Sequence, residues 1–226
     1  VLTDTGNFDS GIPALTVSLR GLVTADVEVR ALEHSLHSGM WGGPVPDPAM
    51  ALCKMLATLT DEEGRLGLPE MVKEVRPLTA AERKAMGDLP YDESDFRKQT
   101  SLLDGVPVRP GLSGKFEPFA QMWREPSVAV NAIEASSRPQ VANIITASAW
   151  ARVGIRVVAD MDPEKIMTQL VKHLESVTPW GLEVKITPDG TGKAWSTRAE
   201  GPAFAAAVKA LEEGYGRKMV FMGCGG

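Results

Sequence analysis

Residues 33–56 read EHSLHSGMWGGPVPDPAMALCKML, and the rest of the chain is organised around this stretch. It predicts the end of a strand, then a turn rich in glycine and proline, then a helix. Asp47 is a suitable N-cap residue, and Pro48 has a φ angle that fits the first helical turn. Apolar side chains then recur with helical spacing at Leu52, Met55, Leu56 and Leu59. We therefore predict a helix over about 47–60.

Several other segments show the two-residue alternation of a half-buried strand. They are residues 21–30, a segment that opens at Val128, residues 149–158 and residues 182–186. Asp162-Pro163 repeats the cap-and-proline signal and opens a second amphipathic helix.

From residue 21 to residue 188 the order is therefore β-α-β-β-α-β, which predicts an α+β fold class. The expected structure is a ferredoxin-like domain with a four-stranded antiparallel sheet and two helices on one face. The opposite face carries Arg152 and Arg156 and needs water, a ligand or a partner against it. Residues 61–125 interrupt the pattern and read as a long insertion, with a short helix near 79–86 capped by Thr79.

Composition limits the class of protein. The chain has 226 residues, 43% of them apolar and 23% charged, as in an ordinary globular protein. It holds no apolar run long enough for a membrane span and no signal-peptide pattern. Two cysteines, Cys53 on the apolar helix face and Cys224, make no disulfide framework, so we expect a cytoplasmic protein with Cys53 in its core. The net charge of −5, with scattered basic residues, argues against nucleic acid as a partner.

Common catalytic motifs are missing from the sequence, which contains no HExxH, CxxC, GxSxG or P-loop. Asp4-Thr5-Gly6 and Asp9-Ser10-Gly11 each spell the aspartic-protease triplet. That chemistry needs two such loops facing each other from two halves, and these lie too close in sequence to do so. Asp4 follows an apolar run, which is a common ligand position in α/β proteins, although a plain turn residue fits equally well. His173, on the second helix, is expected to be structural or at the surface.

The segment SLHSGMWGGPVPDPAMALCKML resembles the lid-domain motif of the carnosinase-like dinuclear zinc peptidases. That superfamily also includes aminoacylases, acetylornithine deacetylase and succinyl-diaminopimelate desuccinylase. PALTVSLRGLV, PSVAVNAIE and IRVVADMDPEKI are similar to other parts of the family, so the resemblance covers nearly the whole chain. It implies a lid or dimerisation domain over 19–199, with its insertion at about 61–125. Residues 1–18 and 200–226 would be remnants of a catalytic domain.

The resemblance implies roles for individual residues. Asp4 falls where the family places a carboxylate ligand to one zinc ion. His37 falls on the lid histidine that reaches the active site of the opposite subunit and donates to the oxyanion of the reaction. Arg156 falls on the arginine that binds the substrate carboxylate, and Asn143 on a polar position that assists at the same end of the substrate.

The terminal FMGCGG resembles the start of a substrate-binding loop, which adds Gly225 and Gly226 to these residues. Without the resemblance, His37 would be a loop histidine that satisfies nearby carbonyl groups, and Arg156 an ordinary surface arginine.

The family's His-x-Asp segment, its paired glutamates and its last zinc histidine have no counterpart here. The chain begins without methionine and stops just after an apolar run, so we expect a fragment that neither binds metal nor turns over substrate. The parent enzyme would hold two zinc ions, with manganese or cobalt as alternatives.

We expect a homodimer joined through the lid domain that hydrolyses a peptide or N-acyl bond next to a free carboxylate. Two alternatives remain: a non-catalytic ferredoxin-like binding or assembly module, and a desuccinylase or deacylase of the same family.

Overall fold

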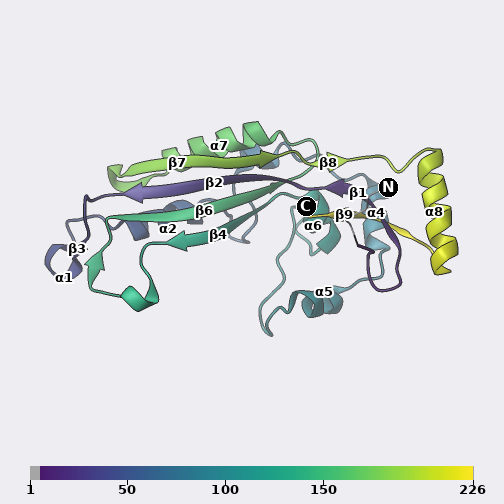
Figure 1. Ribbon diagram of the computed structural model, residues 1–226, viewed down its shortest axis with the longest axis horizontal. Coiled ribbons are helices and arrows are strands. Elements are labelled where there is room, and N and C mark those ends of the chain that lie inside the picture. The colour runs from purple at the N-terminus through teal and green to yellow at the C-terminus, as the bar shows by residue number, and fades with distance from the viewer. Residues whose placement is uncertain (1–5, 226) are drawn as a thin grey trace.

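The computed structural model describes residues 6–225. Its main sheet contains β2 (Gly21–Arg30), β4 (Ser127–Glu134), β6 (Ser148–Val157) and β7 (Glu183–Gly192) in the order β4-β6-β2-β7 (Figure 1). Every neighbouring pair is antiparallel. The predicted α+β, ferredoxin-like architecture is therefore confirmed.

Two helices, α2 (Pro48–Ala57) and α7 (Pro163–Ser176), cover one face of this sheet. Helix α2 packs on β2 and β6, and α7 packs on β2 and β7. The strand residues on this face and the apolar stripes of both helices are fully buried, including Val23, Val27, Val153, Ile155, Leu52, Met55, Ile166 and Leu170. Burial of such a side chain contributes roughly 1.5–3 kcal/mol, so this layer carries most of the stability of the domain.

Both helices begin as the sequence predicted. A side-chain oxygen of Asp47 accepts a hydrogen bond from the Ala49 N–H at 2.8 Å, and Asp162 caps α7 in the same way. The expectation that Cys53 lies in the core is wrong, because its side chain is exposed. Cys53 follows the buried Leu52 by one residue, a rotation of about 100° that carries it off the apolar stripe.

A second sheet lies at one end of the main sheet (Figure 1). Its order is β8-β1-β9, from β1 (Ala14–Leu19), β8 (Trp195–Ser196) and β9 (Val220–Cys224). Strands β1 and β9 run parallel, so segments from the two ends of the described chain are joined here. Helix α8 (Pro202–Tyr215) lies at the extreme of this end and contains no fully buried residue.

The insertion contains four short helices: α3 (Pro69–Val72), α4 (Ala80–Gly87), α5 (Glu93–Thr100) and α6 (Pro118–Arg124). Helix α4 is the one predicted near 79–86, and its capping box is formed. Helix α6 packs on β9, so the insertion covers part of the second sheet.

At the opposite end of the main sheet lies a small tip (Figure 1). It consists of β3 (Leu36–His37), α1 (Ser38–Trp41) and β5 (Ile144–Ile145), next to the 3₁₀ turn η1 (Arg138–Gln140). A second 3₁₀ turn, η2 (Pro179–Gly181), joins α7 to β7. Over residues 6–225, none of the helices combines the length and the apolarity that a bilayer crossing requires.

Candidate functional site

His37 lies at the tip, as the last residue of β3 and the N-cap of α1. Its side chain is exposed, and its Nδ1 accepts a hydrogen bond from the Gly39 N–H at 3.1 Å. Because Nδ1 is the acceptor, the proton of the neutral ring sits on Nε2. The tip therefore presents an N–H donor away from its own backbone.

The glycines next to His37 allow this arrangement. A Cβ atom on Gly39 would lie only 2.9 Å from Cε1 of the ring, so a larger residue would push the imidazole out of place. Gly43 has a φ of 103°, in the region where side chains are strained. The glycine-rich turn of the opening motif therefore sets the position of the ring.

Asn143 lies beside His37. Its carbonyl oxygen accepts a hydrogen bond from the Ser38 N–H at 2.8 Å, and its side chain is exposed. The family resemblance implied that Asn143 assists at the same end of the substrate as Arg156. Within one chain, the structure groups it with His37 instead.

Arg156 lies near the other end of β6, opposite Leu22 of β2 and Ser127 of β4. It projects from the face of the sheet that no helix covers and is partly exposed. In the part of the chain that the structure describes, it takes part in no ion pair. Its positive charge is therefore available to a ligand.

Arg152, on the same face, is by contrast engaged in ion pairs with acidic side chains. It binds both carboxylate oxygens of Asp26, at 2.7 and 2.9 Å, and lies 3.3 Å from Asp189. These hydrogen bonds lower the pKa of the Asp26 carboxyl group and raise that of Arg152. The two arginines look equivalent in sequence, and the structure separates them into a structural residue and an unpaired one.

The tip and Arg156 are far apart. At about 3.3 Å per residue, β6 covers roughly 26 Å from Ser148, next to the tip, to Arg156. A dipeptide is only about 7 Å long. His37 and Arg156 of one chain therefore cannot hold the same small substrate, and a site that used both would need two copies of the chain.

Gly225 lies against Arg20, whose Nη2 is 3.2 Å from the position that a Cβ atom on Gly225 would take. Arg20 was missed by the sequence interpretation, although it directly precedes Gly21 at the corner where β1 passes into β2. Asp4 and Gly226, the remaining predicted site residues, lie outside the described residues.

The described residues do not provide a metal site. Between residues 6 and 225, no three His, Cys, Asp or Glu side chains come close enough together to hold an ion. The structure therefore offers no place for two zinc ions within this part of the chain, and a metal would need ligands from elsewhere.

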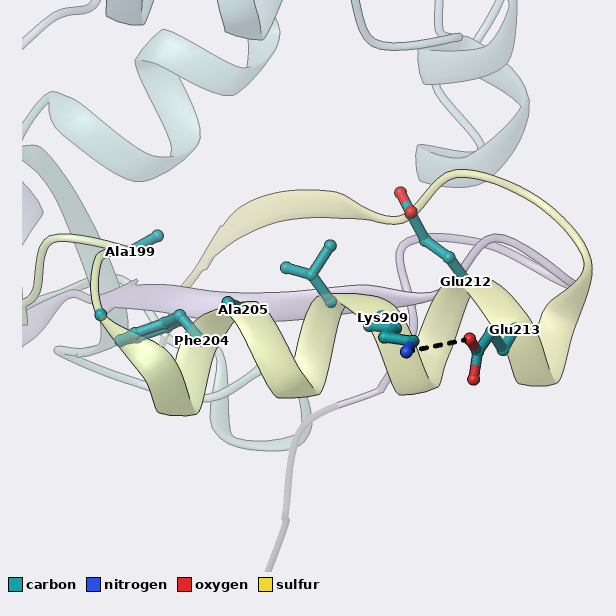
Figure 2. Close-up of a pocket in the computed structure, with 8 residues that line it drawn as sticks. Ala199, Phe204, Ala205, Lys209, Glu212 and Glu213 are labelled. Atoms are coloured by element: carbon teal, nitrogen blue, oxygen red, sulfur yellow. Dashed lines mark ion pairs between the residues drawn. The ribbon is translucent and has the colours of Figure 1, made fainter.

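A pocket along α8 lies well away from the residues above (Figure 2). Phe204, Ala205 and Val208 form its apolar wall, and Lys209 and Glu213 pair at 3.8 Å at its other end. Its lining contains no nucleophile and no metal-ligand cluster, so we do not place the functional site there.

Known proteins resemble this chain over most of its length. A family model described as the peptidase dimerisation domain of the M20 peptidases matches residues 17–182. The cysteinylglycine-S-conjugate dipeptidase of Corynebacterium striatum is 33% identical over 224 residues, which are 99% of this chain and 47% of that protein. The β-Ala-His dipeptidase of Rattus norvegicus is 29% identical over 73% of this chain and 33% of its own length.

Solved structures agree with the fold. The dipeptidase Dug1p of Saccharomyces cerevisiae superimposes with a TM-score of 0.79 and 27% identity, over 94% of this chain and 44% of that one. A metallo-carboxypeptidase from Sulfolobus solfataricus gives a TM-score of 0.81 at 21% identity, over 98% of this chain and 49% of that one. The chain thus spans less than half the length of these relatives. It belongs to the M20 peptidase family and contains that family's dimerisation domain.

Proposed function

We propose that this chain is the lid and dimerisation part of a metal-dependent dipeptidase, which hydrolyses the peptide bond next to a free carboxylate. The observation that carries the proposal is the placement of the exposed His37 in the tip, beyond one end of the main sheet, and of the partly exposed Arg156 near the other end of that sheet. In a homodimer, the tip of one subunit would complete the site that contains Arg156 of the other.

The surface near the tip supports pairing of two copies. Strand β4 is an edge of the main sheet, so its outer backbone groups are open to another strand. Large apolar side chains are exposed on β4, on α1 and α2, just after η1 and on β5: Val130, Ile133, Met40, Trp41, Met50, Val141 and Ile144. An apolar cluster of this kind next to an open strand edge is typical of a protein–protein interface.

The proposed chemistry of this chain's residues is binding and charge stabilisation. Arg156 would hold the substrate carboxylate with its planar fork, and Asn143 would add a hydrogen bond from the partner tip. The Nε2–H of His37 would donate to the oxyanion that forms at the scissile carbonyl, a contribution of about 3 kcal/mol. Gly225 and Gly226 would lie along the substrate next to Arg156.

Metal would be held by the rest of the enzyme together with Asp4, since the described residues lack a ligand set. We propose two zinc ions, with manganese or cobalt as alternatives; when bound they would supply the activated water. In the proposed cytoplasmic enzyme, residues 19–199 belong to the lid, and residues 1–18 and 200–226 belong to the catalytic part. The names of the relatives favour a dipeptide over the N-acyl substrates of the alternative reading.

A hybrid dimer tests the shared site. Full-length His37→Ala and Arg156→Met subunits, each expected to be strongly impaired as a homodimer, are co-expressed with different tags, and the hybrid is purified through both. If the site is shared, one of its two sites carries both wild-type residues, and the hybrid recovers about half of the wild-type kcat for L-cysteinylglycine. If each subunit used its own His37 and Arg156, both sites of the hybrid would be damaged and no activity would return.

A further inference from the structure

Arg20 has a partly buried side chain with a hydrogen-bond donor that lacks a partner among the described residues. It lies between β1 and β2, where its backbone N–H donates to the Cys224 carbonyl oxygen at 3.1 Å. Its guanidinium group is half-buried, and its Nε has no hydrogen-bond partner among residues 6–225. Within the same residues, its one side-chain hydrogen bond runs from Nη1 to the Ser127 hydroxyl oxygen at 3.4 Å. A buried donor without a partner destabilises the fold, and a ligand that accepts its hydrogen bond would remove that cost.

Arg156 is adjacent to the same serine. It is the direct cross-strand partner of Ser127, and residues that pair in this way project to the same face of a sheet. Arg20 and Arg156 therefore come together around Ser127. Burial lowers the pKa of Arg20, and the positive charge of Arg156 lowers it further.

No carboxylate of the described residues neutralises this pair. The ion pairs within residues 6–225 include neither Arg20 nor Arg156, whereas Arg152 on the same face has two acidic partners. Two guanidinium groups held side by side repel each other, and an anion between them removes that repulsion. The arrangement is electrostatically incomplete without such a ligand.

The chemistry of the two groups fits a carboxylate. A carboxylate has two oxygens that together accept about four hydrogen bonds. One planar guanidinium group donates two of them, so a second guanidinium group can donate to the same carboxylate. The Nη2 of Arg20 also lies against Gly225, in the segment expected to run along the substrate. A ligand between the two arginines would therefore lie next to that segment.

We propose that Arg20 and Arg156 form a two-arginine site for the free carboxylate of the peptide substrate. Arg20 thus becomes a second specificity-determining residue beside Arg156, and this inference rests on the proposed function. Discrimination between a peptide acid and its uncharged amide would then come from two guanidinium groups rather than one.

The test uses the full-length enzyme with its metal and two substrates, L-cysteinylglycine and its C-terminal amide. We expect Arg20→Met to lower kcat/KM for the acid at least tenfold and to leave kcat/KM for the amide unchanged. For the acid, the kcat/KM of Arg20→Lys should lie between those of the wild type and Arg20→Met. The matched control is Arg30→Met, at the far end of β2, where the arginine donates to the carbonyl oxygens of Leu32 and Glu33. It should leave both rates unchanged. An equal loss for acid and amide in Arg20→Met would overturn the proposal and assign Arg20 a purely structural role.

A binding measurement separates this inference from the proposed function. Calorimetric titration with N-acetylglycine should show binding that weakens at least tenfold in Arg20→Met, whereas N-acetylglycinamide should not bind. If the enzyme cleaved no dipeptide, the proposed function would fail, and the titration would still decide the two-arginine site. Equal affinity of wild type and Arg20→Met for N-acetylglycine, or no binding by the wild type, would overturn the inference.

Discussion

The backbone N–H of Gly39 donates to Nδ1 of His37 at 3.1 Å and so fixes which ring nitrogen carries the proton. This bond ties the proposed donor to the backbone of the turn two residues later. The imidazole is thereby positioned before any substrate or partner arrives, which is the condition under which a hydrogen-bond donor assists catalysis most.

Gly39→Ala tests this positioning. The new Cβ atom would lie 2.9 Å from Cε1 and 3.2 Å from Nδ1 of His37, so the ring must move. We expect kcat of the full-length enzyme to fall about tenfold or more, with KM and melting temperature nearly unchanged. The control is Gly87→Ala at the end of α4, where an added Cβ meets nothing within 4 Å. An unchanged kcat in Gly39→Ala would contradict a positioning role for this turn.

The two arginines of the open sheet face should respond differently to the same change. Arg152→Met removes the partner of Asp26 and Asp189, so the melting temperature should fall by a few degrees while kcat/KM stays near the wild-type value. Arg156→Met should leave the melting temperature unchanged and lower kcat/KM about 100-fold. Thermal melts and steady-state kinetics on the two variants measure both effects. The reverse pattern would mean that the structure assigns the two roles wrongly.

His173 makes stability depend on pH. Its Nε2 lies 2.7 Å from the Thr58 hydroxyl oxygen, and that hydroxyl donates to the Met55 carbonyl, so Nε2 is the donor. Burial lowers the pKa of His173 below its usual 6.5. Below pH 6.5 the unfolded chain therefore binds more protons than the folded chain. The contribution of His173 to the free energy of unfolding is fully present above pH 6.5 and is lost as the pH falls below that value.

Urea unfolding between pH 5 and pH 7.5 measures this effect. We expect His173→Gln to flatten the decline, whereas the exposed His34→Gln should keep it. If His173→Gln loses stability on acidification as steeply as wild type, another group is responsible.

Glu82 joins separate segments within the insertion. It accepts hydrogen bonds from Arg76 at 2.7 Å and from Arg124 of α6 at 2.8 Å, and it closes the capping box with Thr79. The bonds from Arg76 above all, and then those from Thr79 and Arg124, hold the pKa of the Glu82 carboxyl group far below its usual value. Its stabilising contribution is therefore present above about pH 4.5 and is lost as the pH falls below that value.

Limited proteolysis tests this role. Glu82→Gln should make residues 61–125 more readily cut at neutral pH, because the charged acceptor of two arginines is gone. Acidification should have the same effect on the wild type. Glu62→Gln, at an exposed position, serves as the matched control and should be cut like the wild type. Equal cutting of Glu82→Gln and wild type would exclude the carboxylate as a link.

Local patterns predicted the main sheet and its two helices well. Strand β2 alternates strictly between buried and partly exposed side chains, and such alternation needs no knowledge of distant residues. The N-cap and proline pairs at Asp47 and Asp162 marked where both helices begin. Cys53 shows the limit of this approach, because a residue beside an apolar stripe was assigned to the stripe.

The short helices of the insertion gave weaker signals. Helix α5 is strongly polar and has no buried residue, so its sequence lacks an amphipathic stripe. Its capping box of Asp92 and Asp95 was a readable signal that the sequence interpretation passed over. Helix α6 depends on burial of Phe119 and Trp123 in an aromatic group with segments distant in the chain, and no local rule reveals that.

The candidate site depends on strand register more than on motif. Arg152 and Arg156 share one face of β6, and only the pairing of β2 with β6 shows that Asp26 lies opposite Arg152. Arg20 becomes relevant only because Ser127, more than a hundred residues away, is brought beside it. Asn143 joins His37 through the pairing of β3 with β5, which two residues from each strand form. These relationships are long-range, so the sequence alone could not supply them.

The length of β2 and β6 has a consequence for how such an enzyme can vary. An insertion of two residues into each strand would keep every side chain on its own face, so the layer of packed helices could survive. It would also move the tip outward by about 6.6 Å, more than twice the length of a hydrogen bond. In the proposed dimer, the number of residues along these strands would therefore have to stay constant even where core residues change, because it sets how far the tip of one subunit extends toward the site of the other.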